Sequence, residues 1–239
     1  MKLTMNSTNS EPMLMDNFKF EHPATIMIAG PSKSGKTTLL LKIISQLNDG
    51  LLAPPPNRIV YCYAVWQDAF EEILKSRAAL KNSCSNALMA TLEFKEGMPD
   101  FDNFDPKKIN VLILDDMMTE CGKDPRVLDM FTKDSHHKSI TVFFLTQNIF
   151  PREKYSRSIS LNCQYVLLTN NPRDRLQLIN FGKQVFPGAT KFFAEAFNDA
   201  VTQKRYGYLL LDFNQNTQEE DRVQSGVLAN EERIIYRKK

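Results

Sequence analysis

Residues 30–37 read Gly-Pro-Ser-Lys-Ser-Gly-Lys-Thr, which is a complete G-x-x-x-x-G-K-[ST] pattern. The pattern follows the apolar run 25–29 and opens the apolar-periodic stretch 37–47, so it joins a predicted strand to a predicted helix. Glycines in such a loop let backbone N–H groups close around phosphate oxygens, the lysine contacts the β- and γ-phosphates, and the threonine hydroxyl is a ligand for Mg²⁺. The start of the helix adds the positive end of its dipole. The sequence therefore predicts a site for nucleotide phosphates.

We expect the whole loop and the residue after it to contact the nucleotide. These residues are Gly30, Pro31, Ser32, Lys33, Ser34, Gly35, Lys36, Thr37 and Thr38. Lys36 is the predicted catalytic cation, and Thr37 is a predicted ligand of Mg²⁺.

Two carboxylates end another apolar run. Residues 110–116 read Asn-Val-Leu-Ile-Leu-Asp-Asp, the pattern of a buried parallel strand whose carboxyl end lies at the site. Asp115 is predicted to hold the Mg²⁺, and Asp116 to act as general base toward the attacking water. The apolar run 139–145 is followed by Thr-Gln-Asn. Gln147 is thereby predicted to sense the γ-phosphate or to orient the water, with a simple polar cap on the strand end as the alternative.

Composition limits the class of protein. The chain has 239 residues, of which 42% are hydrophobic, enough for one α/β core without disulfides or metal. Its four cysteines, Cys62, Cys84, Cys121 and Cys163, have no metal-binding spacing and suit a reducing compartment. No apolar stretch approaches the roughly 18–20 residues of a membrane span, so we expect an intracellular protein that does not enter a membrane. The net charge of +2 is too small to argue for nucleic-acid binding by itself.

The chain is predicted to consist of a flexible leader (1–17), one P-loop ATPase domain (18–213) and a polar C-terminal extension (214–239). Strands are expected at 25–29, 58–64, 90–94, 110–115, 139–145, 164–169 and 206–213, with a small candidate at 233–237. Helices are expected at 37–47, 68–80, 125–133 and 188–200, with another starting at an Asn171 cap and His136 and His137 in a turn. This alternation predicts an α/β fold with a doubly wound, mostly parallel sheet and helices on both faces, of the RecA-like type.

Several motifs together resemble one superfamily. They are G-P-S-K-S-G-K-T, V-L-I-L-D-D, F-T-K-D-S-H-H-K-S-I-T-V-F-F-L-T-Q-N, R-S-I-S-L-N, N-P-R-D and Y-G-Y-L-L-L-D. The set resembles the FtsK-HerA superfamily of P-loop ATPases. Within it, the chain is similar to the packaging ATPases of poxviruses, virophages and the Polinton and adintovirus group of virus-like elements. The resemblance extends from about residue 18 to residue 213.

The resemblance implies a motor that uses ATP and Mg²⁺ to translocate double-stranded viral DNA into a preformed capsid. It implies a homo-oligomeric ring, a hexamer or a pentamer, that meets the capsid or its portal vertex at the site of virus assembly in the host cell. Lys36, Thr37, Asp115 and Gln147 match the residues that carry the family's phosphate, metal and T-Q functions. Asp116 departs from the Glu common in cellular members, and its reach is shorter.

Lys33 is a second departure from the family pattern, because related loops usually carry a small residue there. It is expected either to touch the phosphates or to face solvent. Arg157 resembles an arginine of the poxvirus-like members, and we expect it to act as a finger on the neighbouring subunit's nucleotide. Arg173 and Arg175 are alternatives for this role, and a local surface arginine is the plain interpretation of each.

Two other functions stay open at this point. A small-molecule kinase shares the loop and the sheet, but it needs an acceptor pocket. A non-hydrolysing nucleotide-binding module is the other alternative, and the intact Lys36, Thr37, Asp115 and Asp116 argue against it.

Overall fold

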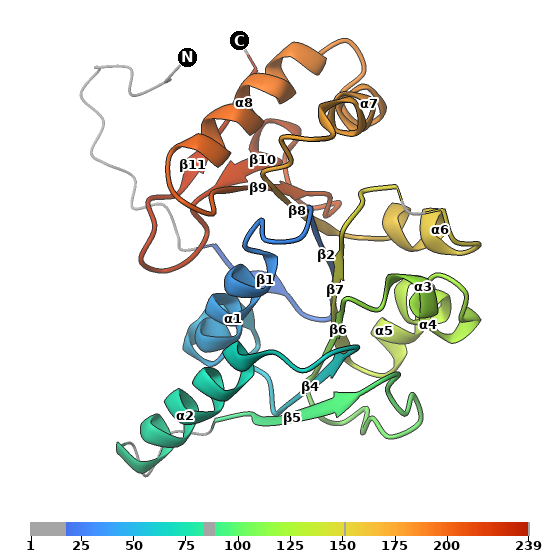
Figure 1. Cartoon of the computed structure of the whole chain (residues 1–239), viewed down its shortest axis with the longest axis vertical. Helices are drawn as coiled ribbons and strands as arrows, with labels where there is room; N and C mark the ends of the chain where they lie inside the picture. Colours follow the sequence, from blue (N-terminus) through green and yellow to red (C-terminus); the bar gives the residue numbers. More distant parts are fainter. Residues whose placement is uncertain (1–17, 84–88, 151, 239) are drawn as a thin grey trace.

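The computed structural model describes residues 18–83, 89–150 and 152–238. Its main element is a nine-stranded sheet with the order β11-β10-β9-β8-β2-β7-β6-β4-β5 (Figure 1). The six strands from β5 to β8 are parallel, and each pair from β8 to β11 is antiparallel. The predicted α/β class, with a mostly parallel sheet and helices on both faces, is therefore confirmed. The predicted leader 1–17 and Cys84 lie outside the described residues.

The strands coincide with the apolar runs of the sequence. Every residue of β2, β6, β7, β8 and β9 is buried, as expected for strands covered on both faces. The bounds of the sheet are β2 (Thr25–Ala29), β4 (Arg58–Tyr63), β5 (Thr91–Glu96), β6 (Asn110–Asp115), β7 (Ile140–Thr146), β8 (Tyr165–Thr169), β9 (Tyr208–Asp212), β10 (Val223–Ser225) and β11 (Ile234–Ile235). A separate parallel pair is formed by β1 (Phe20–Glu21) and β3 (Leu52–Ala53).

Helices cover the two faces of the sheet and create two cores. On one face lie α1 (Lys36–Gln46) and α2 (Asp68–Ser83); on the other lie α3 (Met118–Cys121), α4 (Pro125–Asp129), α5 (Ser135–His137) and α6 (Ser156–Leu161) (Figure 1). Side chains of α7 (Arg175–Val185) and α8 (Thr190–Thr202) share the core of the second face. Because side chains alternate along a strand, Ile26 and Ile28 pack into the α1 core and Met27 and Ala29 into the opposite core.

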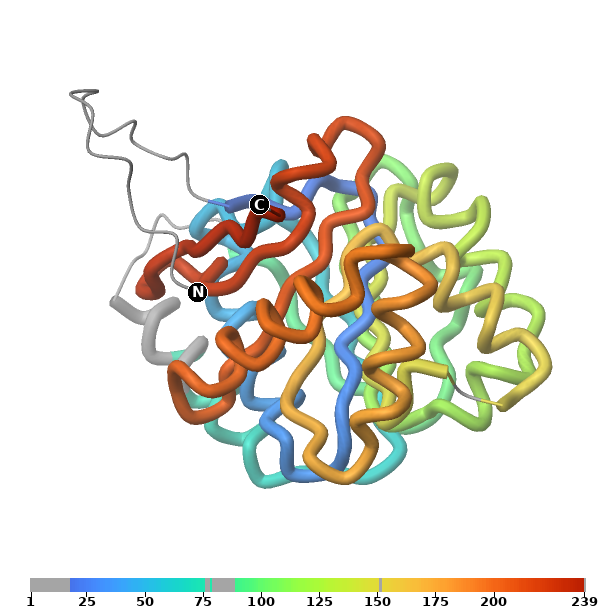
Figure 2. Tube along the Cα trace, turned by 90° about the horizontal axis from the view of Figure 1, so that it is seen from above, coloured from blue at the N-terminus to red at the C-terminus, as the bar shows by residue number. Residues whose placement is uncertain are grey.

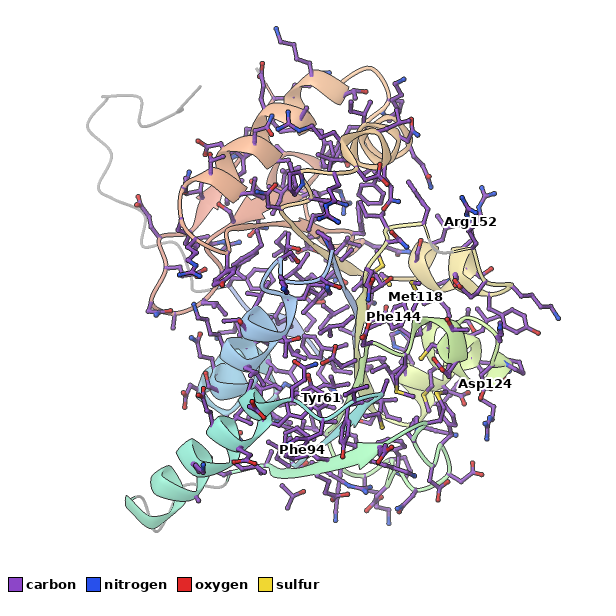
Figure 3. All side chains as sticks on the ribbon, viewed as in Figure 1. Tyr61, Phe94, Met118, Asp124, Phe144 and Arg152 are labelled. Atoms are coloured by element: carbon purple, nitrogen blue, oxygen red, sulfur yellow. The ribbon has the colours of Figure 1, made fainter. Side chains whose placement is uncertain are left out.

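The strand that precedes the glycine-rich loop lies at the centre of the fold. In Figure 2, β2 (blue) runs between the orange-to-red C-terminal segments and the green-to-yellow middle of the chain, in agreement with its pairing to β8 and β7. Side chains fill the space on both sides of the sheet (Figure 3), with Tyr61 and Phe94 on one side and Phe144 and Met118 on the other. The strand that leads into the loop is therefore packed on both faces of the sheet.

The helix predicted at 125–133 is not continuous. After α4, residues Met130–Asp134 form a wider π-helical turn, and a further helical turn, α5, contains His136 and His137. The prediction that these two histidines lie in a connecting turn was therefore wrong. Met130 and Phe131, in the wider turn, are both buried.

The start of α7 also differs from the sequence prediction. Asp174 caps the helix, because its Oδ1 accepts a hydrogen bond from the backbone N–H of Gln177 at 3.0 Å. Asn171, the predicted cap, instead accepts from the N–H groups of Arg173 and Asp174, each at 3.2 Å. Asn and Asp both favour turns and helix caps, so the pattern alone did not separate a preceding turn from the cap itself.

The end of the chain is part of the sheet. The last long strand, β9, begins at Tyr208 rather than at residue 206, and Tyr206 belongs to the preceding turn. Beyond residue 213, β10 pairs with β9 and β11 pairs with β10. The segment predicted as a polar extension therefore adds two short strands to the main sheet.

His22 holds the entry to β2 against the start of β7. Its Nδ1 lies 2.8 Å from Thr141 Oγ1, and its Nε2 lies 2.9 Å from Ser139 Oγ. Burial lowers the pKa of His22 to about 4, because the charged form loses solvation. The folded protein therefore keeps this imidazole neutral at pH values where an unfolded chain protonates it.

This difference predicts a pH-dependent stability. Between about pH 6.5 and pH 4 the unfolded state takes up a proton at His22 and the folded state does not, so the free energy of unfolding decreases as the pH falls. We expect His22→Gln to show a smaller decrease than the parent in urea titrations across this range. His137→Gln, at an exposed histidine, is the control and should retain the parent slope. Equal slopes in the parent and His22→Gln would contradict the assignment.

Candidate functional site

The glycine-rich loop is closely packed between β2, β7 and β8. The N–H of Gly30 donates to the carbonyl of Thr146 at 3.1 Å, which continues the pairing of β2 with β7 into the loop. A Cβ atom at Gly30 would lie 1.9 Å from Thr169 Oγ1, so no larger residue fits without movement. Ser34 Oγ lies 2.7 Å from the same hydroxyl. The loop is therefore held to the ends of the two strands that flank β2.

The loop ends at the N-terminus of α1. Gly35 is the N-cap and has a φ of 93°, a left-handed conformation that glycine adopts without strain. No side chain caps this helix end. Its first N–H groups are therefore available to an anionic ligand, which the helix dipole also favours.

The side chain of Lys36 folds back over the start of the loop. Its Nζ donates to the carbonyl of Pro31 at 2.9 Å. Burial lowers the pKa of its ammonium group, and the nearby carboxylates of Asp115 and Asp116 oppose this effect. The lysine and both carboxylates therefore lie close enough to interact electrostatically.

Asp115 is the last residue of β6 and is only 3% exposed. The hydroxyl of Tyr61 donates to its Oδ2 at 2.6 Å. Burial raises the pKa of Asp115, while this hydrogen bond and Lys36 act in the opposite direction. Tyr61 therefore fixes the orientation of the carboxylate through one oxygen and leaves the other without that bond.

Asp116 and Gln147 are joined directly. Gln147 Nε2 donates to Asp116 Oδ1 at 3.0 Å, and both side chains are exposed. This contact follows from the strand order, because β7, which precedes Gln147, pairs with β6 on one side and with β2 on the other. Asp116 has a φ of 56°, a left-handed conformation that aspartate tolerates better than most residues. The two polar ends thus meet at the carboxyl edge of the sheet.

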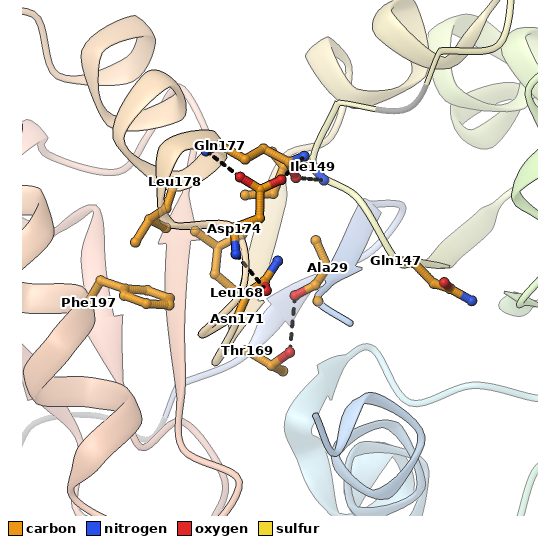
Figure 4. A pocket seen from close by; sticks show the side chains of 11 residues that line it. Ala29, Gln147, Ile149, Leu168, Thr169, Asn171, Asp174, Gln177, Leu178 and Phe197 are labelled. Carbon is orange, nitrogen blue, oxygen red and sulfur yellow. Dashed lines mark hydrogen bonds between the residues drawn. The ribbon is translucent and has the colours of Figure 1, made fainter. Parts of the chain in front are cut away.

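A small cavity of about 20 Å³ lies behind the loop. Figure 4 shows its lining, in which Gln177 donates to Asp174 at 3.2 Å and accepts from the N–H of Ile149 at 2.7 Å. Gly30 and Gln147 belong to the same lining. A volume of this size holds about one water molecule. The cavity is therefore too small to accept a second substrate.

Residues with metal-ligand chemistry are present at this edge. The Thr37 hydroxyl follows Lys36 in α1, and Asp115 is coupled electrostatically to that lysine. A hydroxyl and a carboxylate are oxygen ligands of the kind that Mg²⁺ prefers. The uncapped helix end and the glycine cradle offer a place for phosphate oxygens, so the residues fit both ATP and Mg²⁺.

The candidate arginines lie away from these contacts. Arg157 is exposed and lies on α6, the short helix before β8. Arg173 and Arg175 are also exposed, at the start of α7. Within residues 18–83, 89–150 and 152–238, no hydrogen bond or ion pair joins any of the three to the loop or to the carboxylates. Lys33 is exposed as well, with a φ of 64°.

Comparisons with known proteins identify solved structures with a similar fold. No protein-family model matches the sequence, and no curated protein matches it. The DNA-packaging ATPase B204 of Sulfolobus turreted icosahedral virus is 18% identical, with a TM-score of 0.52 over 82% of this chain and 95% of B204. This chain therefore shares the fold of that protein. The genome packaging NTPase B204 of Sulfolobus turreted icosahedral virus 2, in complex with sulfate, is 14% identical, with a TM-score of 0.50 over 82% of this chain and 94% of that one.

The fold shared with B204 confirms the predicted P-loop class with a RecA-like, mostly parallel sheet. Among the helices that the structure describes, none combines the length and the apolar character that a membrane crossing requires. Sequence reasoning missed Tyr61 and Gln177, which contact the site from β4 and α7. Tyr61 lies within an apolar run and looks like a core residue until its hydroxyl is paired with Asp115.

The hydrogen bond from Tyr61 yields a test of the predicted metal site. Tyr61→Phe keeps the buried ring but removes the donor that orients Asp115. Because outer partners of metal ligands are typically worth 10- to 100-fold in metal affinity, we expect the Mg²⁺ concentration for half-maximal ATP hydrolysis to rise by about tenfold.

Tyr63→Phe, on the same strand, is the matched control and should leave the Mg²⁺ dependence unchanged. An unchanged Mg²⁺ requirement in Tyr61→Phe would show that the hydroxyl does not position a metal ligand.

Proposed function

We propose that this protein is an ATP-driven motor that translocates double-stranded viral DNA into a preformed capsid as a homo-oligomeric ring. One observation carries the ATPase part of the proposal: Lys36 of the complete phosphate loop is electrostatically coupled to Asp115 and Asp116, and Asp116 accepts a hydrogen bond from Gln147, which follows the intervening strand β7. The packaging-ATPase fold supports the DNA-translocation part.

Each residue has a role in this mechanism. The loop amides and Lys36 bind and neutralise the phosphates, because phosphoryl transfer depends mainly on positioning and charge stabilisation. Thr37 and Asp115 would hold Mg²⁺, which would neutralise negative charge that develops during phosphoryl transfer. Gln147 orients the attacking water beside Asp116, which accepts its proton. The hydrogen bond between these two side chains keeps them at a common point.

The trans arginine belongs to the same proposal. We assign Arg157 as the first candidate, with Arg173 and Arg175 as alternatives, because all three are exposed and available to a neighbouring subunit. Arg152, in the same segment as α6, also points away from the protein (Figure 3). A ring that meets a capsid or portal vertex would act at the site of virus assembly in the host cell.

A kinase is less well supported than a motor. The cavity next to the loop, about 20 Å³, is far smaller than the roughly 300–1,000 Å³ of a typical small-molecule site.

Asp116 provides the test of catalysis. General bases typically contribute 10²- to 10⁴-fold to a rate, so Asp116→Asn should bind ATP as the parent does and hydrolyse it about 10²- to 10⁴-fold more slowly. Lys36→Ala should instead lose ATP binding. Asp49→Asn, an exposed carboxylate on the turn after α1, is the matched control and should hydrolyse at the parent rate. Parent-like turnover by Asp116→Asn would exclude it as the base.

DNA binding provides the test of the motor. A motor that passes every sequence must grip the phosphate backbone, and such binding weakens steeply with salt because counterions are released. We expect binding to duplexes of random sequence, with affinity falling about tenfold or more between 50 and 200 mM salt. Fluorescence anisotropy with duplexes of equal length and different sequence measures both properties. Salt-independent binding, or strong preference for one sequence, would oppose translocation.

A further inference from the structure

The turn between α8 and β9 touches the phosphate loop. A Cβ atom built on Gly35 would lie 2.5 Å from Cδ1 of the Tyr206 ring, so the ring is in contact with the backbone of this glycine. Gly35 immediately precedes the lysine of the loop and is the N-cap of α1. The side chain of Tyr206 is nevertheless 40% exposed. An aromatic surface thus faces solvent directly beside the N-terminus that is expected to hold phosphates.

Tyr206 occupies this place although its backbone is unfavourable. Its φ is 63°, a left-handed conformation that is rare for a bulky aromatic residue. Such conformations persist only where surrounding structure imposes them, and they are often found at ligand sites.

The surrounding turn is firmly anchored. The N–H of Gly207 donates to the carbonyl of Lys204 at 3.0 Å, and a Cβ at Gly207 would lie 2.4 Å from the carbonyl oxygen of Ala200. Glu231 accepts hydrogen bonds or ion pairs from both sides of the turn, from Lys204 Nζ at 2.5 Å and from the Tyr208 hydroxyl at 2.6 Å. The position of the Tyr206 ring is therefore determined before any ligand binds.

A planar group already lies on this ring. The guanidinium carbon of Arg205 is 5.0 Å from the centroid of the Tyr206 ring. This cation–π contact shows that the ring presents a face to a group outside the phosphate loop. A nucleotide whose phosphates lie in the loop must extend its base away from them, and Tyr206 offers a preformed aromatic surface at that point.

We propose that Tyr206 binds the base of the nucleotide by stacking. This inference rests on the proposed function, because it assumes that the loop binds a nucleoside triphosphate. Stacking uses the π-face that every base has and does not read the hydrogen-bonding edge. The site therefore takes nucleoside triphosphates without reading the edge of the base, and Tyr206 contributes equally to the binding of ATP and GTP.

The test compares ATP with inorganic tripolyphosphate, which has the phosphates and lacks the base. Tyr206→Asn removes the ring while tolerating the left-handed backbone. We expect its affinity for ATP and for GTP to fall by about 5- to 150-fold, the factor of one base–aromatic stack, and its affinity for tripolyphosphate to stay at the parent value. Tyr206→Phe keeps the ring and should bind all three ligands like the parent. Calorimetry of the full chain with Mg²⁺ measures each affinity.

A second measurement works without removal of the ring. Tyr206→Trp should show a change in tryptophan fluorescence on addition of ATP but not of tripolyphosphate. The parent, whose single tryptophan is Trp66, provides the background signal.

The outcomes separate this inference from the proposed function. Unchanged ATP affinity in Tyr206→Asn, or an equal loss for ATP and tripolyphosphate, would mean that Tyr206 only supports the loop. The absence of an ATP-specific fluorescence change in Tyr206→Trp would overturn the inference in the same way. A parent protein that binds neither ATP nor tripolyphosphate would overturn the proposed function and, with it, the base contact.

Discussion

The pairing of β2 with β7 is the constraint on which the site depends. It places the loop after β2 beside the polar end of β7, and the hydrogen bond from Gly30 to Thr146 extends this register by one residue into the loop. Because β7 also pairs with β6, the end of β7 lies beside the end of β6, and Gln147 there contacts Asp116. The carboxyl ends of parallel strands lie at one edge of a sheet. The phosphate loop, Asp116 and Gln147 therefore lie near one another although they are distant in sequence.

The charges of the site balance one another in a partly buried setting. Burial lowers the pKa of Lys36 and raises that of Asp115, and each of these two groups opposes the effect on the other. The hydroxyl of Tyr61 adds a neutral donor to Asp115. A buried carboxylate without partners is costly, because its charge loses solvation. Here Lys36 and Tyr61 both stabilise the charge of Asp115. Further positive charge from a metal ion is compatible with this arrangement because two carboxylates face one lysine.

Much of the fold and part of the site follow from local patterns. The apolar runs ending in Asp115 and before Gln147, and the glycine-rich loop, are contiguous in sequence, and their chemistry is visible in a few residues. Tyr61 and Tyr206 were not predicted as site residues, because each acts through a contact with a residue far away in the chain. Tyr206 also lies next to a strand, and a pattern of apolar residues does not reveal that it has a left-handed backbone. Long-range contacts and backbone conformations of this kind require the three-dimensional structure.

The two edges of the sheet limit how copies of the chain associate. At one edge, β5 has a row of charged side chains, Glu93, Lys95 and Glu96, and Glu93 is paired with Arg58 at 2.8 Å. At the other edge, β11 has only two residues. Charged and very short edge strands discourage pairing with strands of another molecule. Continuous β-sheet polymerisation is therefore disfavoured, and in the proposed ring the contacts between copies would fall to helices and loops, where they can form and break without rupturing a backbone ladder.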